Sequence, residues 1–246
     1  MTESDIVAGL NDSDIADNQG DMWSFVGVLP DSSFVHTAHC GKRNLEEAKI
    51  FIGKIKAKSD GTSPLISSDD WFYEKALLAY YGLLHQPCYK GRGRPPLPYL
   101  VPKPELLYVQ VTKKRDSKGN ITEIGERIVY GTQEAVALHF EKAKRCKHIN
   151  TDYVESRNGK FRKDNARLIR KTLCHSKKAC FHNAMIQLVA QISNYCHPIE
   201  ALKQIINPIA AKFEQKYKQL SPAMAEGLID RILSLKDLLY MRPRPV

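Results

Sequence analysis

Several features that would assign a chain to a common class are missing from this sequence of 246 residues. No run of about 18 apolar residues occurs, which argues against a membrane-spanning helix. The first 21 residues contain six acids and no Lys or Arg, so the basic start and apolar stretch of a signal peptide are missing too. We therefore expect a cytoplasmic protein with no membrane partner.

Cysteine is present without a recognisable pattern. The six cysteines include no Cys-x-x-Cys pair, so neither a disulfide framework nor a common zinc motif is indicated. Cys174, His175, Cys180 and His182 lie close together in the sequence, but their spacing matches none of the usual zinc patterns. We expect reduced thiols in ordinary packing positions.

Basic residues are in excess and unevenly distributed. The chain has 37 Lys and Arg against 27 Asp and Glu, a formal net charge of +10. Residues 1–20 are acidic, poor in aromatics and predicted to be disordered, whereas residues 142–178 are dense in Lys and Arg. This asymmetry favours a polyanionic partner such as a nucleic acid. A hydrophobic content of 43% suffices for one large domain or one domain with appendages.

Hydrophobic periodicity predicts strands in the first half of the chain and helices between and after them. A turn at Pro30, Asp31 and Ser32 separates the first two strands, and Asn44 caps the first helix. After Thr132 only helices are predicted, so the pattern indicates an α/β sheet covered by helices. The predicted strands are 22–29, 33–39, 64–67, 105–114 and 120–131, and the predicted helices are 45–58, 72–84, 133–145, 178–195 and 223–239, besides a basic helix that begins near residue 152.

The most unusual acid is Glu155, which precedes that basic run. From Arg157 to Lys171 the sequence RNGKFRKDNARLIRK contains a single acid, Asp164. We predict one continuous helix here, with basic side chains on one face for phosphates. Its buried face is expected to carry Val154, Phe161, Leu168 and Leu173.

Acids at two strand ends are candidates to join Glu155 in one site. Asp21 precedes the first strand, and Asp69 and Asp70 follow the strand at 64–67. Carboxylates gathered in one place can bind two Mg²⁺ ions, and the bound ions can promote cleavage of a phosphodiester. Each acid also has a structural interpretation, because Asp152 and Glu155 can close a helix N-terminus and Asp69 and Asp70 can cap the helix that follows.

The motif residues around Glu155 resemble a known family. The segments NTDYVESRNGKFRKDNARLIRKTLCHSK, SNYCHPIEALK and SPAMAEGLIDRILSLKDLL are similar to the C-terminal half of bacterial insertion-sequence transposases of the DDE class. MWSFVG, GKRNLEEAKIF and GRGRPPLPYLVPKPELLYVQV also resemble this family, so the likeness covers residues 19–241. It implies a ribonuclease H-like mixed sheet flanked by helices at residues 21–175 and a helical C-terminal region at 176–246.

The resemblance also implies an activity, metal-dependent DNA cleavage and strand transfer at insertion-sequence ends. Glu155 matches the third catalytic acid, and Asp69, or its neighbour Asp70, matches the second. With Asp21 as the first, these acids would hold two Mg²⁺ or Mn²⁺ ions. The implied partners are DNA ends, target DNA and further copies of the chain, in the nucleoid of a bacterial cytoplasm.

The sequence departs from the family pattern where the first acid is expected. The family has Asp followed by Glu before the tryptophan, and here Gly20 and Asp21 take those places. Either Asp21 is the first acid shifted by one position, or Gly20 has replaced it, and the two alignments point a strand side chain to opposite faces. The family's usual N-terminal DNA-binding segment is also missing. The sequence therefore leaves three interpretations: an active transposase, a truncated and inactive DNA-binding remnant, and a nuclease or resolvase of the same fold.

Expected DNA contacts lie in two segments. The Pro- and Gly-rich loop at 87–104 contains KGRGRPP, whose core resembles an AT-hook that inserts arginines into the minor groove, or is otherwise a flexible basic loop. The second segment is the basic helix. The expected DNA-binding residues are Arg92, Arg94, Arg157, Asn158, Lys160, Arg162, Lys163, Arg167, Arg170 and Lys171.

Overall fold

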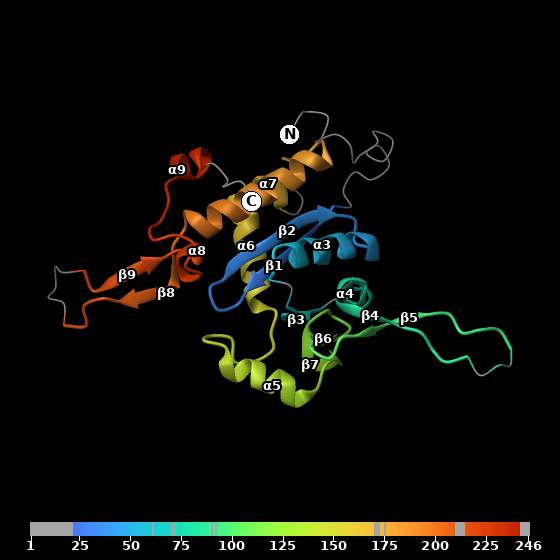
Figure 1. The fold of residues 1–246 in the computed structure, drawn as a ribbon. Coiled ribbons are helices and arrows are strands. Elements are labelled where there is room, and N and C mark those ends of the chain that lie inside the picture. The colour runs from blue at the N-terminus through green and yellow to red at the C-terminus, as the bar shows by residue number, and fades with distance from the viewer. Residues whose placement is uncertain are drawn as a thin grey trace. The chain divides into compact units, whose positions relative to one another are not determined.

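The computed structural model describes residues 22–241 except 61, 70–71, 90, 92, 170–172, 175 and 210–214. Helices and strands are interleaved along the chain, with one mixed sheet, so the predicted mixed α/β class is confirmed (Figure 1). The chain divides into two compact units, which we call unit 1 (residues 22–42 and 156–241 of the described part) and unit 2 (residues 43–155). The expected domain boundaries after residues 20 and 175 stay predictions, because both fall beside residues outside the described part.

Unit 1 begins with the predicted hairpin. Strands β1 (Trp23–Leu29) and β2 (Phe34–Gly41) pair antiparallel, with a register shift after Gly27. The turn between them includes Ser33 at φ 57°, in the left-handed region. The alternation of apolar side chains therefore predicted both strands and their turn correctly.

Helix α7 (Ala179–Tyr195) covers β2 and closes the core of unit 1. Its buried positions Ile186, Val189 and Ala190 follow the three- and four-residue spacing of one helix face. Asn194, on the same helix, accepts a hydrogen bond from the Val35 N–H at 2.8 Å and donates one to the Val35 carbonyl at 2.9 Å. The core cluster comprises Val26, Val35, Ala38, Cys40, Phe161, Ile186, Val189 and Ala190.

The basic segment is shorter as a helix than predicted. Helix α6 (Asp152–Asp164) ends before Asn165, whose side chain accepts a hydrogen bond from the Arg167 N–H at 3.0 Å. A short 3₁₀ helix, η1 (Ala166–Leu168), follows. The prediction of one helix through residue 171 was therefore wrong over the described residues, because an Asn side chain caps a new turn there. The division between the two units falls in α6, after Glu155.

The C-terminal region is not purely helical, which corrects the prediction. Strands β8 (Ile199–Ile205) and β9 (Tyr217–Leu220) pair antiparallel. The predicted helix at 223–239 is instead two short helices, α8 (Pro222–Ala225) and α9 (Leu235–Tyr240). Gly227 takes φ 72° just after α8, a conformation that ends a helix.

Unit 2 contains a three-stranded mixed sheet in the order β3-β6-β7. Strand β3 (Leu65–Ser68) runs parallel to β6 (Leu107–Arg115), which pairs antiparallel with β7 (Ile121–Tyr130) as the predicted hairpin. Helices α3 (Leu45–Ala57) and α4 (Tyr73–Tyr81) pack against each other, and α5 (Gln133–Lys142) follows β7. The Asn44 side chain accepts a hydrogen bond from the Glu47 N–H at 2.9 Å, which confirms the predicted cap.

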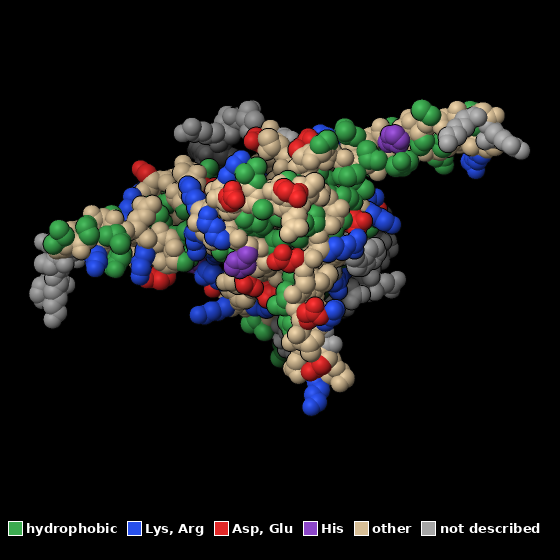
Figure 2. Space-filling view, turned by 90° about the horizontal axis from the view of Figure 1, so that it is seen from below, with side chains coloured by type: hydrophobic (Ala, Val, Ile, Leu, Met, Phe, Trp, Pro, Cys, Tyr) green, Lys and Arg blue, Asp and Glu red, His purple; other side chains and the backbone are tan. Residues whose placement is uncertain are grey.

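The predicted loop at 87–104 is irregular over its described residues up to position 98, and a hairpin that the sequence did not predict closes it. Helix α4 ends at Tyr81, three residues before its predicted end, and β4 (Gly82–His85) pairs antiparallel with β5 (Tyr99–Pro102). Hydrophobic side chains cover this hairpin in Figure 2, with a histidine among them. Leu84 is 70% exposed there. The Pro and Gly residues thus form the end of a hairpin.

Two further expectations concern the whole chain. Among the described helices, none combines the length and hydrophobicity that crossing a membrane requires. The six cysteines all lie in the described part, and none of them forms a disulfide there.

Candidate acidic site and basic surface

Glu155 is the centre of a small polar cluster in unit 2. Its carboxylate lies in the first turn of α6 and forms an ion pair with the Lys113 ammonium of β6. The Thr151 hydroxyl lies 3.2 Å from Glu155 Oε1 and 3.3 Å from Lys113 Nζ, so the three side chains contact one another. The Glu155 side chain is 56% exposed, whereas that of Lys113 is only 17% exposed. The carboxylate is therefore held by a lysine yet accessible to a ligand.

The cluster lies over the same face of the sheet as the end of β3. Val109, Val111 and Lys113 occupy every second position of β6, so their side chains point to the same face of the sheet. Ser67 is the register partner of Val109, and its hydroxyl donates to the Asn150 carbonyl at 3.5 Å. The residues that lead into α6 therefore contact the C-terminal end of β3.

Asp69 follows β3 directly and is exposed. The strand ends at Ser68 and the backbone bends at Asp69. Both Asp69 and Glu155 thus belong to segments that meet at one end of the β3-β6 pair. Asp70, the alternative to Asp69, lies outside the described residues.

Neither Asp69 nor Asp152 occupies the helix-capping position that the sequence allows. Phe72 is the N-cap residue of α4, and its side chain makes no capping hydrogen bond. At α6 the residue before the helix is Thr151, whose carbonyl accepts a hydrogen bond from the Glu155 N–H at 3.0 Å. Thr151, rather than Asp152, therefore occupies the N-cap position.

The donor set for a metal is incomplete in the described residues. No cluster of three or more His, Cys, Asp or Glu able to hold a metal occurs among them. Asp21 lies outside the described part, and so does His175 of the Cys/His segment. Two carboxylates, one of them paired with Lys113, do not supply the oxygen ligands that two hard divalent ions require. We therefore derive no chemical step through a metal.

The basic side chains of unit 1 differ in their solvent exposure and in their ion pairs. Arg162, Lys163 and Arg167 are exposed, Asn158 is half-buried, and Arg170 and Lys171 lie outside the described residues. Lys160 forms an ion pair with Asp164 at 2.9 Å. The surface expected from the sequence is thus present in part, carried by exposed cations at the end of α6 and in η1.

Arg157 is buried instead of facing solvent. It is 5% exposed, and its Nη1 donates to the Ser193 hydroxyl of α7 at 3.0 Å. Burial lowers the pKa of its guanidinium from the usual value. Because Arg157 lies four residues before the buried Phe161, the two share a helix face. This side chain holds α6 to α7 within unit 1 and offers little surface to a phosphate.

Two glycines near the tip of the β4–β5 hairpin have positive φ values. Gly91 and Gly93 have φ values of 75° and 81°, and the Tyr89 hydroxyl donates to the Gly93 carbonyl at 2.9 Å. Arg94 is exposed, while Arg92 lies outside the described residues. The AT-hook resemblance and the expected DNA contacts of Arg92 and Arg94 stay predictions.

Sequence reasoning missed Lys113 and Thr151 as neighbours of Glu155. Lys113 is 42 positions away in sequence and belongs to a different element, so no local pattern links it to the acid. Thr151 could have been found, since it stands immediately before the first helical residue, where Thr commonly caps. No protein-family model, no curated protein and no solved structure matches this chain significantly. The transposase resemblance therefore rests on the motif residues alone.

Proposed function

We propose that the chain is a DNA transposase of the DDE class, which cleaves phosphodiesters and transfers strands at insertion-sequence ends. The observation that carries the proposal is the position of Glu155, within a family-like motif and at the end of the sheet where Asp69 follows β3. Exposed cations at the end of α6 and in η1 support a DNA partner because phosphate contacts dominate affinity for DNA. Ends and target would both be DNA, and activity on two ends would require more than one copy of the chain.

A ribonuclease H-like topology is part of this proposal. Its support is the mixed sheet of unit 2, in which parallel β3 and β6 adjoin the antiparallel β7. An acid directly after β3 and another at the start of α6 fit the general tendency of α/β sheets to place sites at the carboxyl ends of their strands.

Divalent ions are the implied cofactors. We propose Asp21, Asp69 and Glu155 as ligands of two Mg²⁺ or Mn²⁺ ions, with Asp21 required to complete the set. Hard cations select carboxylate oxygens, which is the chemistry these three side chains share. The proposed location is the bacterial nucleoid.

A second candidate is an inactive DNA-binding remnant of such a transposase. Two observations favour it: Gly20 stands where the family has its first acid, and Lys113 neutralises Glu155. Under this alternative the basic surface would still bind DNA, with an affinity that falls as salt rises, and no strand would be cut.

The test is a cleavage and joining assay. The purified chain is incubated with Mg²⁺, Mn²⁺ or EDTA and a plasmid carrying the DNA that flanks its coding sequence. An active transposase nicks or joins strands only with the divalent ion, and Glu155→Gln abolishes both reactions. Glu123→Gln is the matched control, because Glu123 is an exposed acid of unit 2 that also pairs with a lysine, Lys114, at 2.7 Å.

The outcomes separate the candidates. Salt-sensitive DNA binding with no cleavage in any metal would support the remnant. Cleavage without joining would support a nuclease of the same fold. If the wild-type chain binds no DNA at all, both the transposase and the remnant are refuted.

A further inference from the structure

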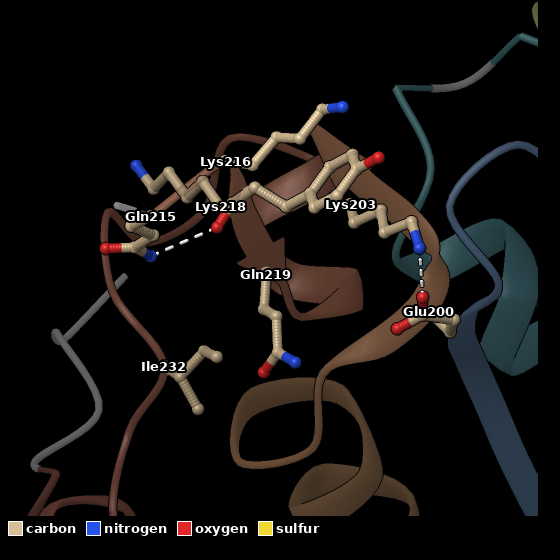
Figure 3. Close-up of a pocket in the computed structure, with 8 residues that line it drawn as sticks. Glu200, Lys203, Gln215, Lys216, Lys218, Gln219 and Ile232 are labelled. Carbon is tan, nitrogen blue, oxygen red and sulfur yellow. Dashed lines mark hydrogen bonds and ion pairs between the residues drawn. The ribbon is translucent and has the colours of Figure 1, made fainter. Parts of the chain in front are cut away.

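A depression of about 620 Å³ lies on the β8–β9 hairpin of unit 1. The hairpin contributes most of its lining, and Ile232 contributes the rest (Figure 3). Three lysines and an aromatic ring surround it, and Glu200 is the only acid among the described lining residues. Apolar side chains usually dominate small-molecule sites, and this lining is mostly polar and cationic. The chemistry of the depression therefore suits an extended polyanion.

Tyr217 is the centre of this surface. It is 37% exposed and pairs across the hairpin with Ile205, so its ring lies on the same face as Lys203. The Lys203 ammonium lies 4.7 Å from the ring centroid, and the Lys216 ammonium lies 5.6 Å from it. Both ammonium groups lie over the ring, so a base that stacks on it would take the place of an ammonium, and the displaced cation could contact the adjoining phosphate.

The three lysines differ in their acidic neighbours. Lys203 donates to Glu200, and this hydrogen bond raises the pKa of its ammonium, so the lysine stays charged at neutral pH. Among the described residues, neither Lys216 nor Lys218 has an ion pair, and Figure 3 draws both side chains extending from the hairpin. Of the described lining residues, the one acid, Glu200, is thus neutralised by Lys203.

The backbone beneath the ring is held in place. Gln215 Nε2 donates to the Tyr217 carbonyl at 3.0 Å, and β9 runs on into Leu220, which is 7% exposed. The hairpin is anchored at that end by the buried Ser221 and Pro222 at the start of α8. A platform fixed at its base costs less conformational entropy when a flexible strand binds to it.

We propose that the β8–β9 hairpin binds single-stranded DNA, with Tyr217 stacking on one base and Lys216 and Lys218 contacting the phosphates on either side. The inference rests on the proposed function in assuming DNA as the partner, and it adds a second contact surface for an unpaired strand. Single-stranded DNA fits better than a duplex because a paired base has no free face for the ring.

The test uses the full chain, oligo(dT), a duplex of equal length and oligo(rU), with affinity measured by fluorescence anisotropy. Tyr217→Ala is expected to weaken oligo(dT) binding roughly 5- to 100-fold, the range measured for loss of one stacked base. Tyr217→Phe retains the ring and should bind as the wild type does. Binding of the duplex should change less than twofold in both variants.

The lysines are tested by salt dependence. Lys216→Ala combined with Lys218→Ala should reduce the slope of log affinity against log salt by about 1.4, because each phosphate contact on a single strand contributes about 0.7. The matched control combines Lys177→Ala with Lys236→Ala, two exposed lysines of unit 1 outside the depression. Circular dichroism of each variant checks that the fold is retained.

The results decide this proposal separately from the proposed function. Oligo(dT) binding that does not depend on Tyr217, or an equal loss in the lysine control, would overturn the hairpin site even if the chain cleaves DNA. Tighter binding of oligo(rU) than of oligo(dT) would overturn DNA as its ligand. Binding that depends on Tyr217 in a chain that neither binds duplex ends nor cleaves them would support the hairpin and refute the transposase.

Discussion

Replacing Asn194 by Ala should destabilise unit 1 strongly. Asn194 is fully buried, and its amide satisfies both the N–H and the carbonyl of Val35, itself only 2% exposed. The substitution leaves both groups of Val35 buried without this partner. Each unsatisfied group costs about 1 to 3 kcal/mol, so the expected loss in unfolding free energy is about 2 to 6 kcal/mol. This is a large fraction of the total for a typical domain.

The assay is urea unfolding followed by the fluorescence of Trp23, in a Trp71→Phe background so that one tryptophan in β1 reports on unit 1. The midpoint should fall while the slope with urea is unchanged, since the surface exposed on unfolding is the same. Gln191→Ala is the control: it is an exposed position of the same helix and should change stability by less than about 0.5 kcal/mol. If Asn194→Ala behaves like Gln191→Ala, the reasoning about the buried amide is refuted.

Three further predictions concern other parts of the chain. Gly131→Ala should destabilise unit 2 by about 1 to 3 kcal/mol in urea, because Gly131 has φ 95° and an added Cβ would lie 2.4 Å from Leu107 Cδ2; an unchanged midpoint would contradict this. Burial, and then the charge of Glu74, raise the pKa of Tyr130 to about 12. Its folded-state pKa exceeds the ordinary value of about 10, so the free energy of unfolding of the wild type should fall relative to that of Tyr130→Phe as pH rises from about 10 to about 12; a difference between the two proteins that stays constant over that range would argue against it. Lys163→Ala should lower the salt slope of duplex binding by about 0.9, and an unchanged slope would remove this residue from the DNA surface.

The elements that local signals specify were predicted well. Alternating apolar residues and a turn predicted β1 and β2, and the Asn44 cap marked the start of α3. The β6–β7 hairpin was expected from its turn, where the Asp116 side chain accepts a hydrogen bond from the Asn120 N–H at 2.8 Å. In each case the residues that determine the structure lie within a few positions of one another.

The elements that depend on distant partners were not predicted. Strands β8 and β9 are short, and their segments were taken as helical because neither reveals its pairing with the other. The burial of Arg157 depends on Ser193, which lies 36 positions away, although its four-residue spacing from Phe161 pointed to the same face. Glu155 was correctly singled out as unusual, but its ion pair with Lys113 appears only when β6 and α6 are brought together.

The central proposal is that Asp69 and Glu155 serve, together with Asp21, as ligands of a divalent-ion site that acts on DNA. It is tested most directly by titrating Mn²⁺ into the chain bound to DNA, with free Mn²⁺ measured by electron paramagnetic resonance. We expect Asp69→Asn and Glu155→Gln each to weaken Mn²⁺ binding roughly tenfold or more, Lys113→Met to strengthen it by removing a competing cation, and Glu123→Gln to leave it unchanged. Mn²⁺ affinity that is the same in the wild type and in Glu155→Gln would contradict the proposal.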